Sequence, residues 1–331
     1  MKAKRLLPIL ALTLAATTLT ACGDKTVTFG HYWRTNSLVT TEPFYEQAKY
    51  TVSSTTNQSS YANYTVEYAG TFTTTFEYIA NQGVYQFDTQ LDVTATFKLG
   101  DEKKEVTDTA VSSVTFEATT NKLRPIKSYK KMLCHIPLTG EFSKADTCYA
   151  TVDYEYDITY ATDKDQGTLV SKKYQITNNG GKTTDYALNT TFDFVEDHTY
   201  IDNEQLLVAV RALSADTTSA TLGCYGVFAK AAQKVSVSYT STEDDANKTY
   251  TYALTNADGS DGGNSHSVLA RTASLKLDQK NPGATQEILL GKAKDPSKNV
   301  HRNVILSIKT PLSYTMGVIE YKLAEVTYFK A

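Results

Sequence analysis

The five histidines are the first residues to consider for catalytic chemistry, because imidazole is the side chain that titrates near neutral pH. None of them lies in a GxSxG or HExxH frame, the local motifs that join a base to a nucleophile or to zinc. They are His31, His135, His198, His266 and His301. We therefore expect no enzyme activity, and histidines clustered with carboxylates in one cleft would reverse that expectation.

Oxygen ligands for a metal are best represented by Asp258, Asp261 and Asn264 in a glycine-rich stretch. These residues lack the alternating spacing and the terminal bidentate Glu of a calcium loop. A flexible hairpin tip explains them equally well. No CxxC or Cys/His spacing suggests zinc. We expect no metal and no cofactor.

The most specific motif in the chain is Leu19-Thr20-Ala21-Cys22. It closes an apolar run that follows Lys2, Lys4 and Arg5, which is the plan of a secretory signal. The run is shorter than the about 20 apolar residues that span a bilayer. The motif matches the lipobox, at which the chain is cut before a cysteine that is then lipidated. The alternative is an ordinary signal peptide that happens to end near a cysteine.

A lipobox predicts both location and attachment. We expect residues 1–21 to be removed as a signal peptide and Cys22 to carry the lipid. A diacyl anchor is about what stable membrane attachment takes. The predicted location is the extracytoplasmic face of the cell membrane, with the lipid anchor as the membrane partner.

Charge argues against nucleic acid as a partner. The full chain of 331 residues has a formal net charge of −3, and removal of residues 1–21 makes it −6. No basic patch is left to neutralise phosphates, so neither nucleic acid nor an anionic lipid surface is an expected electrostatic partner.

Three cysteines follow Cys22 in a compartment where disulfides persist. Cys134 and Cys148 flank a short loop that contains Pro137 and Gly140, so a disulfide between them would close that loop. Cys224 would then be a free thiol. The alternative is that all three are small buried apolar side chains.

The segment behind the predicted anchor, residues 22–40, is an arm with aromatic residues rather than a Gly/Ser linker. Treated as flexible coil it reaches only about 25 Å, so the folded body should lie close to the membrane. Tyr32 and Trp33 would suit an interfacial role. Packing of the arm against the folded domain is the reading that we favour.

From about Thr40 onward, apolar and polar residues alternate with a period of two over long runs, which indicates strands with one solvated face. Turn sequences such as Asn81-Gln82-Gly83 separate the runs. Runs of fifteen residues would be about 50 Å long, and accumulated twist should curl such strands. We therefore predict a mainly β fold, with residues 41–331 forming one half-barrel domain built on a long curved antiparallel sheet.

One segment breaks this period. Between residues 202 and 214 apolar residues recur at helical spacing, and Asp202 with Gln205 three residues later can form a capping box. This predicts one amphipathic helix, whose apolar face needs the concave side of the sheet for burial.

Three segments carry a family resemblance: Tyr200 to Leu213, Leu123-Arg124-Pro125 after a strand, and Gly317-Val318-Ile319-Glu320-Tyr321-Lys322-Leu323. The chain resembles the half-barrel bacterial lipoproteins related to the Lol-type lipoprotein carriers over most of residues 45–331. The resemblance implies a curved sheet that wraps a helical plug and holds an apolar cavity. Soluble carriers of that type are not lipidated, so the anchor at Cys22 argues against a shuttling role.

The leading hypothesis is an anchored protein that binds a lipid or another apolar or amphipathic ligand in the groove between sheet and helix. Arg211 would bind the ligand headgroup, or would instead pair with a carboxylate or reach water. The aromatic residues would line the groove, or would instead form the core. The residues proposed for the groove are Leu206, Leu207, Val210, Arg211, Leu213, Tyr68, Phe72 and Phe87. The alternative function is a structural or adhesive envelope scaffold without a ligand cavity.

Overall fold

The computed structural model describes most of the chain after residue 42. The described residues are 27–30, 33, 43–119, 122–178, 181–195, 198–213, 217–227, 230–240, 248–277, 285–292, 303–312 and 315–331. The predicted signal peptide, Cys22 and most of the arm lie outside them. No described helix has the length and hydropathy of a membrane span.

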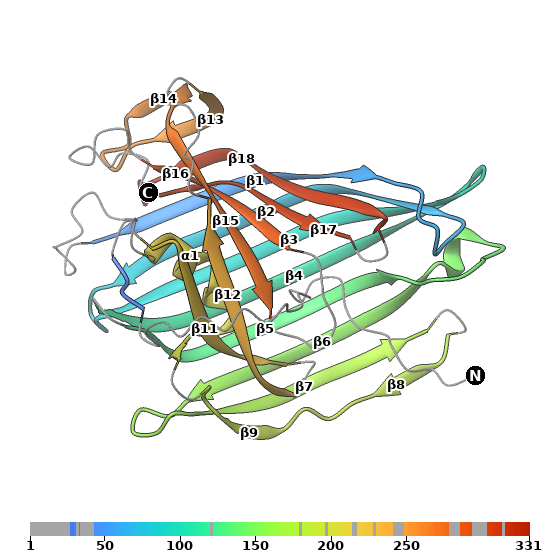
Figure 1. Cartoon of the computed structure of the whole chain (residues 1–331), viewed down its shortest axis with the longest axis horizontal. Coiled ribbons are helices and arrows are strands. Elements are labelled where there is room, and N and C mark those ends of the chain that lie inside the picture. The colour runs from blue at the N-terminus through green and yellow to red at the C-terminus, as the bar shows by residue number, and fades with distance from the viewer. Residues whose placement is uncertain are drawn as a thin grey trace.

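One large sheet dominates the fold, and nearly all of its neighbouring strands are antiparallel (Figure 1). Its first part contains β1 (Tyr45–Thr56), β2 (Thr65–Ile79), β3 (Val84–Leu99), β4 (Glu102–Thr119), β5 (Lys122–Pro137), β6 (Tyr149–Tyr160), β7 (Gln166–Thr177), β8 (Thr183–Asp185) and β9 (Thr190–Asp193). Its second part contains β10 (Thr199–Tyr200), β11 (Ser219–Gly226), β12 (Ala231–Tyr239), β13 (Thr249–Thr255), β14 (Asp261–Ser267), β15 (Leu269–Leu277), β16 (Gln286–Lys292), β17 (Ile305–Pro311) and β18 (Gly317–Thr327). The helical segments are η1 (Ala145–Thr147), η2 (Asn203–Gln205) and α1 (Leu206–Ala212).

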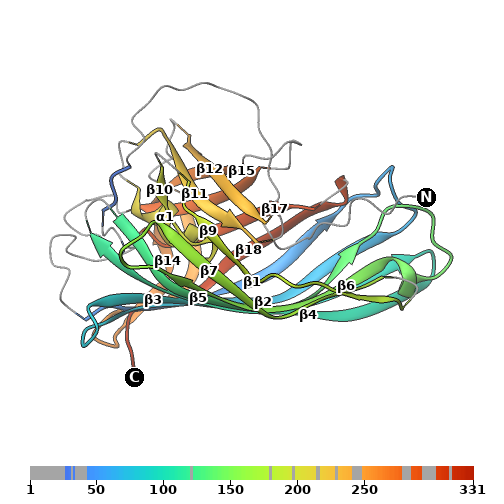
Figure 2. The same cartoon turned by 90° about the horizontal axis from the view of Figure 1, so that it is seen from below.

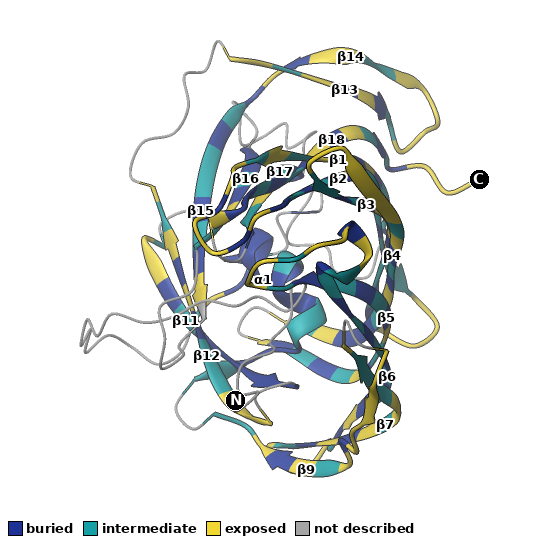
Figure 3. Ribbon diagram, turned by 90° about the vertical axis from the view of Figure 1, so that its right-hand side faces the viewer, coloured by how far each residue is buried: buried dark blue, intermediate teal, exposed yellow. Residues whose placement is uncertain are grey.

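The sheet is continuous from β7 through β6, β5, β4, β3 and β2 to β1, and then through β18, β17, β16, β15 and β12 to β11. It curls until its two edges meet near α1 (Figure 3). There Phe192 of β9 stacks on Tyr225 of β11 with ring centroids 4.0 Å apart. The predicted curved antiparallel sheet is confirmed.

Strand length explains the curl. The strands β2 to β5 contain 15, 16, 18 and 16 residues, far more than the usual 3 to 10. Right-handed twist accumulates over such lengths and bends the sheet. The predicted alternation is also confirmed, most regularly in β6, where every second residue from Ala150 to Tyr160 is buried.

The predicted helix is present but shorter than residues 202–214. Asp202 is its N-cap: the side chain accepts from the Glu204 N–H at 2.7 Å, while the Gln205 side chain accepts from the Asp202 N–H at 2.9 Å. The first turn is 3₁₀ and the α-helix ends at Ala212. It stops there because Leu213 adopts an extended backbone and forms a β-bridge with Phe29.

The described residues of the arm pack against the domain. Gly30 donates to the carbonyl of Ala212 at 2.6 Å. Trp33 is fully buried, with its ring 5.2 Å from that of Phe76 and 5.7 Å from that of Tyr85. Trp33 therefore belongs to the core and is not available for a membrane interface.

The predicted disulfide is wrong, because Cys134 and Cys148 are free and buried, as is Cys224. The register of the β5–β6 hairpin separates the two. Cys134 faces Val152, whereas the carbonyl of Cys148 accepts from Leu138, four residues beyond Cys134. Four residues of a strand span about 13 Å, while a disulfide requires Cα atoms within about 7 Å. All three cysteines instead fill the core as small side chains.

Candidate functional site

The concave face of the sheet is the candidate site, and strand register orders its inward side chains into rows that cross β2 to β5. The row under the helix contains Phe76, Phe87, Val114 and Ser128. The next row, which we call the polar row, contains Thr74, Thr89, Ser112 and Lys130. The row after it contains Phe72, Leu91, Ala110 and Met132. We call all inward positions beyond the polar row the distal face.

At the helix end, α1 is tied to β1 by a buried ion pair. The Arg211 guanidinium donates to both carboxylate oxygens of Glu46, at 2.6 and 2.7 Å, and its Nε donates to the carbonyl of Asn303 at 2.9 Å. Both side chains are buried, at 3% and 1% exposure. The sequence left two roles open for Arg211, a ligand anchor or a partner of a carboxylate. In the structure Arg211 pairs with the carboxylate of Glu46.

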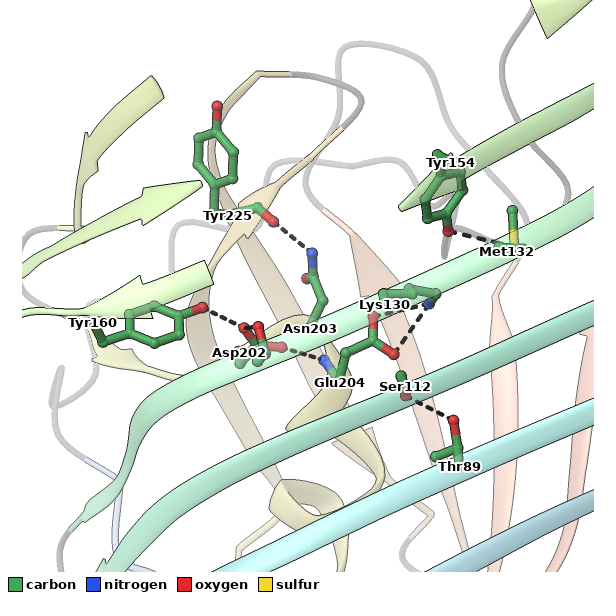
Figure 4. Close-up of polar contacts among 11 residues, drawn as sticks. Thr89, Ser112, Lys130, Met132, Tyr154, Tyr160, Asp202, Asn203, Glu204 and Tyr225 are labelled. Atoms are coloured by element: carbon green, nitrogen blue, oxygen red, sulfur yellow. Dashed lines mark hydrogen bonds and ion pairs between the residues drawn. The ribbon is translucent and has the colours of Figure 1, made fainter. Parts of the chain in front are cut away.

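A second group of polar contacts joins Asp202 and η2 to β5 and β6 (Figure 4). Ser128 donates to Asp202 at 2.6 Å, and the Tyr160 hydroxyl donates to the same carboxylate. Lys130 of the polar row binds both oxygens of Glu204, at 2.8 and 3.1 Å. Burial, followed by the charge of Glu204, raises the pKa of Asp202. These contacts fix the helix above the polar row.

The distal face is mainly apolar, and Asp108 is a buried charge on it. This carboxylate is 2% exposed and accepts from Nδ1 and from the backbone N–H of His135, at 2.6 and 3.1 Å. Burial raises the pKa of Asp108, and the contacts from His135 oppose that rise. In the next row the Tyr68 hydroxyl is buried without a hydrogen-bond partner in the described chain.

The structure separates the predicted groove residues into two groups. Leu206, Val210, Arg211 and Leu213 are buried at the helix end, where Leu207 is half-buried and Phe87 packs on Phe76 with centroids 5.7 Å apart. Tyr68 and Phe72 lie on the distal face. The polar row runs between the groups, so they do not line one surface.

Sequence reasoning missed Asp108 and Lys130, although a signal was present. Both occupy inward positions of their strands, Asp108 between Val106 and Ala110 in β4 and Lys130 between Ser128 and Met132 in β5. A charged residue at such a position must find a partner inside the fold. Their inward position in the strand could have been predicted from the sequence, but their partners could not.

The glycine-rich loop is a hairpin tip. The Asp258 carboxylate accepts from the backbone and hydroxyl of Ser260, at 2.9 and 2.6 Å, and Asp261 accepts from the Gly263 N–H at 2.7 Å. These local bonds lower the pKa of Asp258. Among the described residues no group of three or more His, Cys, Asp or Glu side chains could hold a metal ion.

Comparison with known proteins gives little beyond the fold. No family model and no curated protein matches the sequence, so the resemblance to Lol-type carriers has no support at the level of sequence. One similar solved structure is a beta-barrel-like protein of a domain of unknown function, DUF1849, from Brucella abortus. It is 9% identical, with a TM-score of 0.45, and the match covers 87% of this chain and 99% of that one. Such low similarity says nothing about ligand or activity, and this chain is established only as a β-rich protein with a large curved, barrel-like sheet.

Proposed function

We propose that this protein is a membrane-anchored extracytoplasmic lipoprotein that binds the apolar part of an amphipathic ligand along its distal face. One observation carries the proposal: the helix is far shorter than the concave face. The seven residues of α1 span about 10 Å, whereas the strands beneath it reach about 50 Å. Most of the inward apolar surface therefore lies away from the helix.

The arrangement of the second sheet part agrees with this. The described strands β11, β12, β15 and β17 gather with α1 over one end of β2 to β7 (Figure 2). The other end of those strands lies away from α1 (Figures 1 and 2). An apolar surface with a few convergent polar groups is the usual form of a small-molecule site.

The anchor would set the orientation of this site. Val27 is the first described residue and donates to the hydroxyl of Thr199 at 3.4 Å, near the helix end of the barrel. Val27 lies five positions after Cys22, and a fully extended chain of that length reaches about 18 Å. A lipid on Cys22 would hold the helix end toward the bilayer and the distal face away from it.

No reaction is part of the proposal. The Asp108–His135 contact is the one feature of a catalytic dyad on the distal face of the described chain. The neighbouring thiol, Cys134, is buried, and burial followed by the Asp108 charge raises its pKa well above the usual range. Because a thiolate is the reactive form, this environment opposes nucleophilic chemistry.

The scaffold alternative predicts the opposite interior. It requires a distal face filled by the protein itself and an outer face made for partners. The described outer face is solvated, with ion pairs between strands such as Lys98–Glu67 at 2.6 Å and Lys49–Glu325 at 3.0 Å. This surface could form ionic contacts with a partner. The two functions are distinguished by whether a ligand occupies the distal face.

The test compares two neighbouring residues of β4 that point to opposite faces. Ala110 lies on the distal face, whereas Val111 is 39% exposed on the outside. The full chain, with Ala110→Trp or Val111→Trp, would be purified from membranes and its bound lipids identified by mass spectrometry. We expect bound amphipath in the wild type and in Val111→Trp, and its loss in Ala110→Trp. Equal lipid content in the two variants, or none in the wild type, would contradict the proposal.

A further inference from the structure

We infer that Tyr68, Asp108 and Tyr321 bind the polar head of the ligand, and that this head is uncharged and bears a hydroxyl group. The inference rests on the proposed function and adds the chemical class of the ligand. It places the head on the distal face, one or two rows beyond Phe72, with the apolar side chains of the Phe72 row next to it.

An unsatisfied hydroxyl is the starting observation. Tyr68 is 4% exposed and its hydroxyl lacks a hydrogen-bond partner in the described residues, although its backbone N–H donates to Ser54 at 2.8 Å. A buried polar group without a partner destabilises a fold, and native structures contain few of them. A bound ligand group at this position would supply the acceptor that the Tyr68 O–H lacks.

Strand register brings two further polar groups to the same region. Asp108 pairs with Val93 in the row next to that of Tyr68. Tyr321 of β18 lies in the row of Asp108, because that row runs from Tyr321 across Val52, Gly70 and Val93 to Asp108. All three side chains are buried. After burial, the charge of Asp108 contributes to the raised pKa of both Tyr68 and Tyr321, as expected for groups in one neighbourhood.

The charges around Tyr68 limit the charge that the polar head of the ligand can carry. Asp108 is an acceptor with a buried negative charge, which disfavours a phosphate or carboxylate beside it. Lys130, the cation of the polar row, is held by Glu204 and is not free to neutralise an anion. Asp108 therefore disfavours an anionic head beside it.

A hydroxyl matches the remaining hydrogen-bond needs. It can donate to Asp108, whose Oδ1 already accepts from His135, and it can accept from the Tyr68 hydroxyl. An ammonium has donors but no acceptor, so it would leave the Tyr68 O–H unmatched. A glycerol or sugar head on an acyl chain has the required chemistry.

The experiment uses three photoreactive probes that each carry one hydrocarbon chain of the same length: a monoacylglycerol, a lysophosphatidic acid and an alkylamine. The full chain in phosphatidylcholine vesicles would be titrated with each probe, and cross-linked protein quantified and mapped. Tyr68→Phe is the test variant. Tyr64→Phe is the matched control, because Tyr64 directly precedes β2, is buried like Tyr68, and its hydroxyl already donates to the carbonyl of Leu138 at 2.7 Å.

We expect the monoacylglycerol to bind most tightly and to label β2, β3 and β4. Tyr68→Phe should weaken it about tenfold, the effect of one lost hydrogen bond, while Tyr64→Phe leaves its affinity unchanged. Without ligand, Tyr68→Phe should melt at a higher temperature than the wild type. Equal affinity for the three probes, unchanged by Tyr68→Phe, would overturn this inference alone. No binding of any probe to the wild type overturns the proposed function as well.

Discussion

The Arg211–Glu46 pair decides whether the helix end is structural or part of the ligand site. Replacing Arg211 by Met keeps much of the side-chain volume but leaves the Glu46 carboxylate buried without its partner. Breaking a buried ion pair in this way costs about 3 to 5 kcal/mol. The pair is fully enclosed and bidentate, so we expect the loss to reach that range.

The double variant provides the control. Replacing Glu46 by Leu together with Arg211→Met removes both charges, and well-packed apolar replacements of a buried pair are often neutral. We expect the double variant to recover most of the stability lost by Arg211→Met. Urea unfolding followed by circular dichroism gives the free energies.

Two results would refute this reasoning. One is a loss below about 1 kcal/mol in Arg211→Met, the size typical of an exposed pair. The other is a double variant no more stable than the single one. If Arg211→Met kept its stability but lost its bound lipid, Arg211 would be a ligand anchor after all.

Three further predictions concern single side chains. Gly70→Ala should destabilise strongly, because its Cβ would stand 2.2 Å from the carbonyl oxygen of Asp92; urea unfolding measures the loss, and near-wild-type stability would contradict the packing. Cys134 and Cys224 should resist maleimide at pH 8 until the chain is unfolded, because burial raises both thiol pKa values, that of Cys224 to about 12; rapid labelling of the native chain would contradict their burial. Asp202 has a folded pKa above its unfolded value of 3.8, so its contribution to stability falls as the pH rises from about 4. Asp202→Asn lacks that fall, so its stability deficit relative to the wild type should shrink with rising pH in unfolding titrations; a constant deficit would argue against the raised pKa.

The fold could be predicted because its information is local. The alternation in β6 follows from side-chain direction in a strand, and the capping box at Asp202 follows from the unpaired N–H groups at a helix start. The end of the helix could not be predicted in this way. It depends on the bridge between Leu213 and Phe29, residues that are remote in sequence.

The candidate site was harder to predict because it depends on register. Tyr68, Asp108 and Tyr321 come from β2, β4 and β18, and only strand pairing places them in neighbouring rows. The disulfide prediction failed for the same reason. Cys134 and Cys148 are close in sequence, but the hairpin register displaces them along the strands.

The most direct test of the ligand-binding proposal is an experimental structure of the full chain purified from membranes. The proposal predicts elongated density over the distal face, beside Phe72, Leu91 and Met132, with its polar end at Tyr68. Side chains packed against one another across the distal face, with no density between them, would contradict it and favour the scaffold.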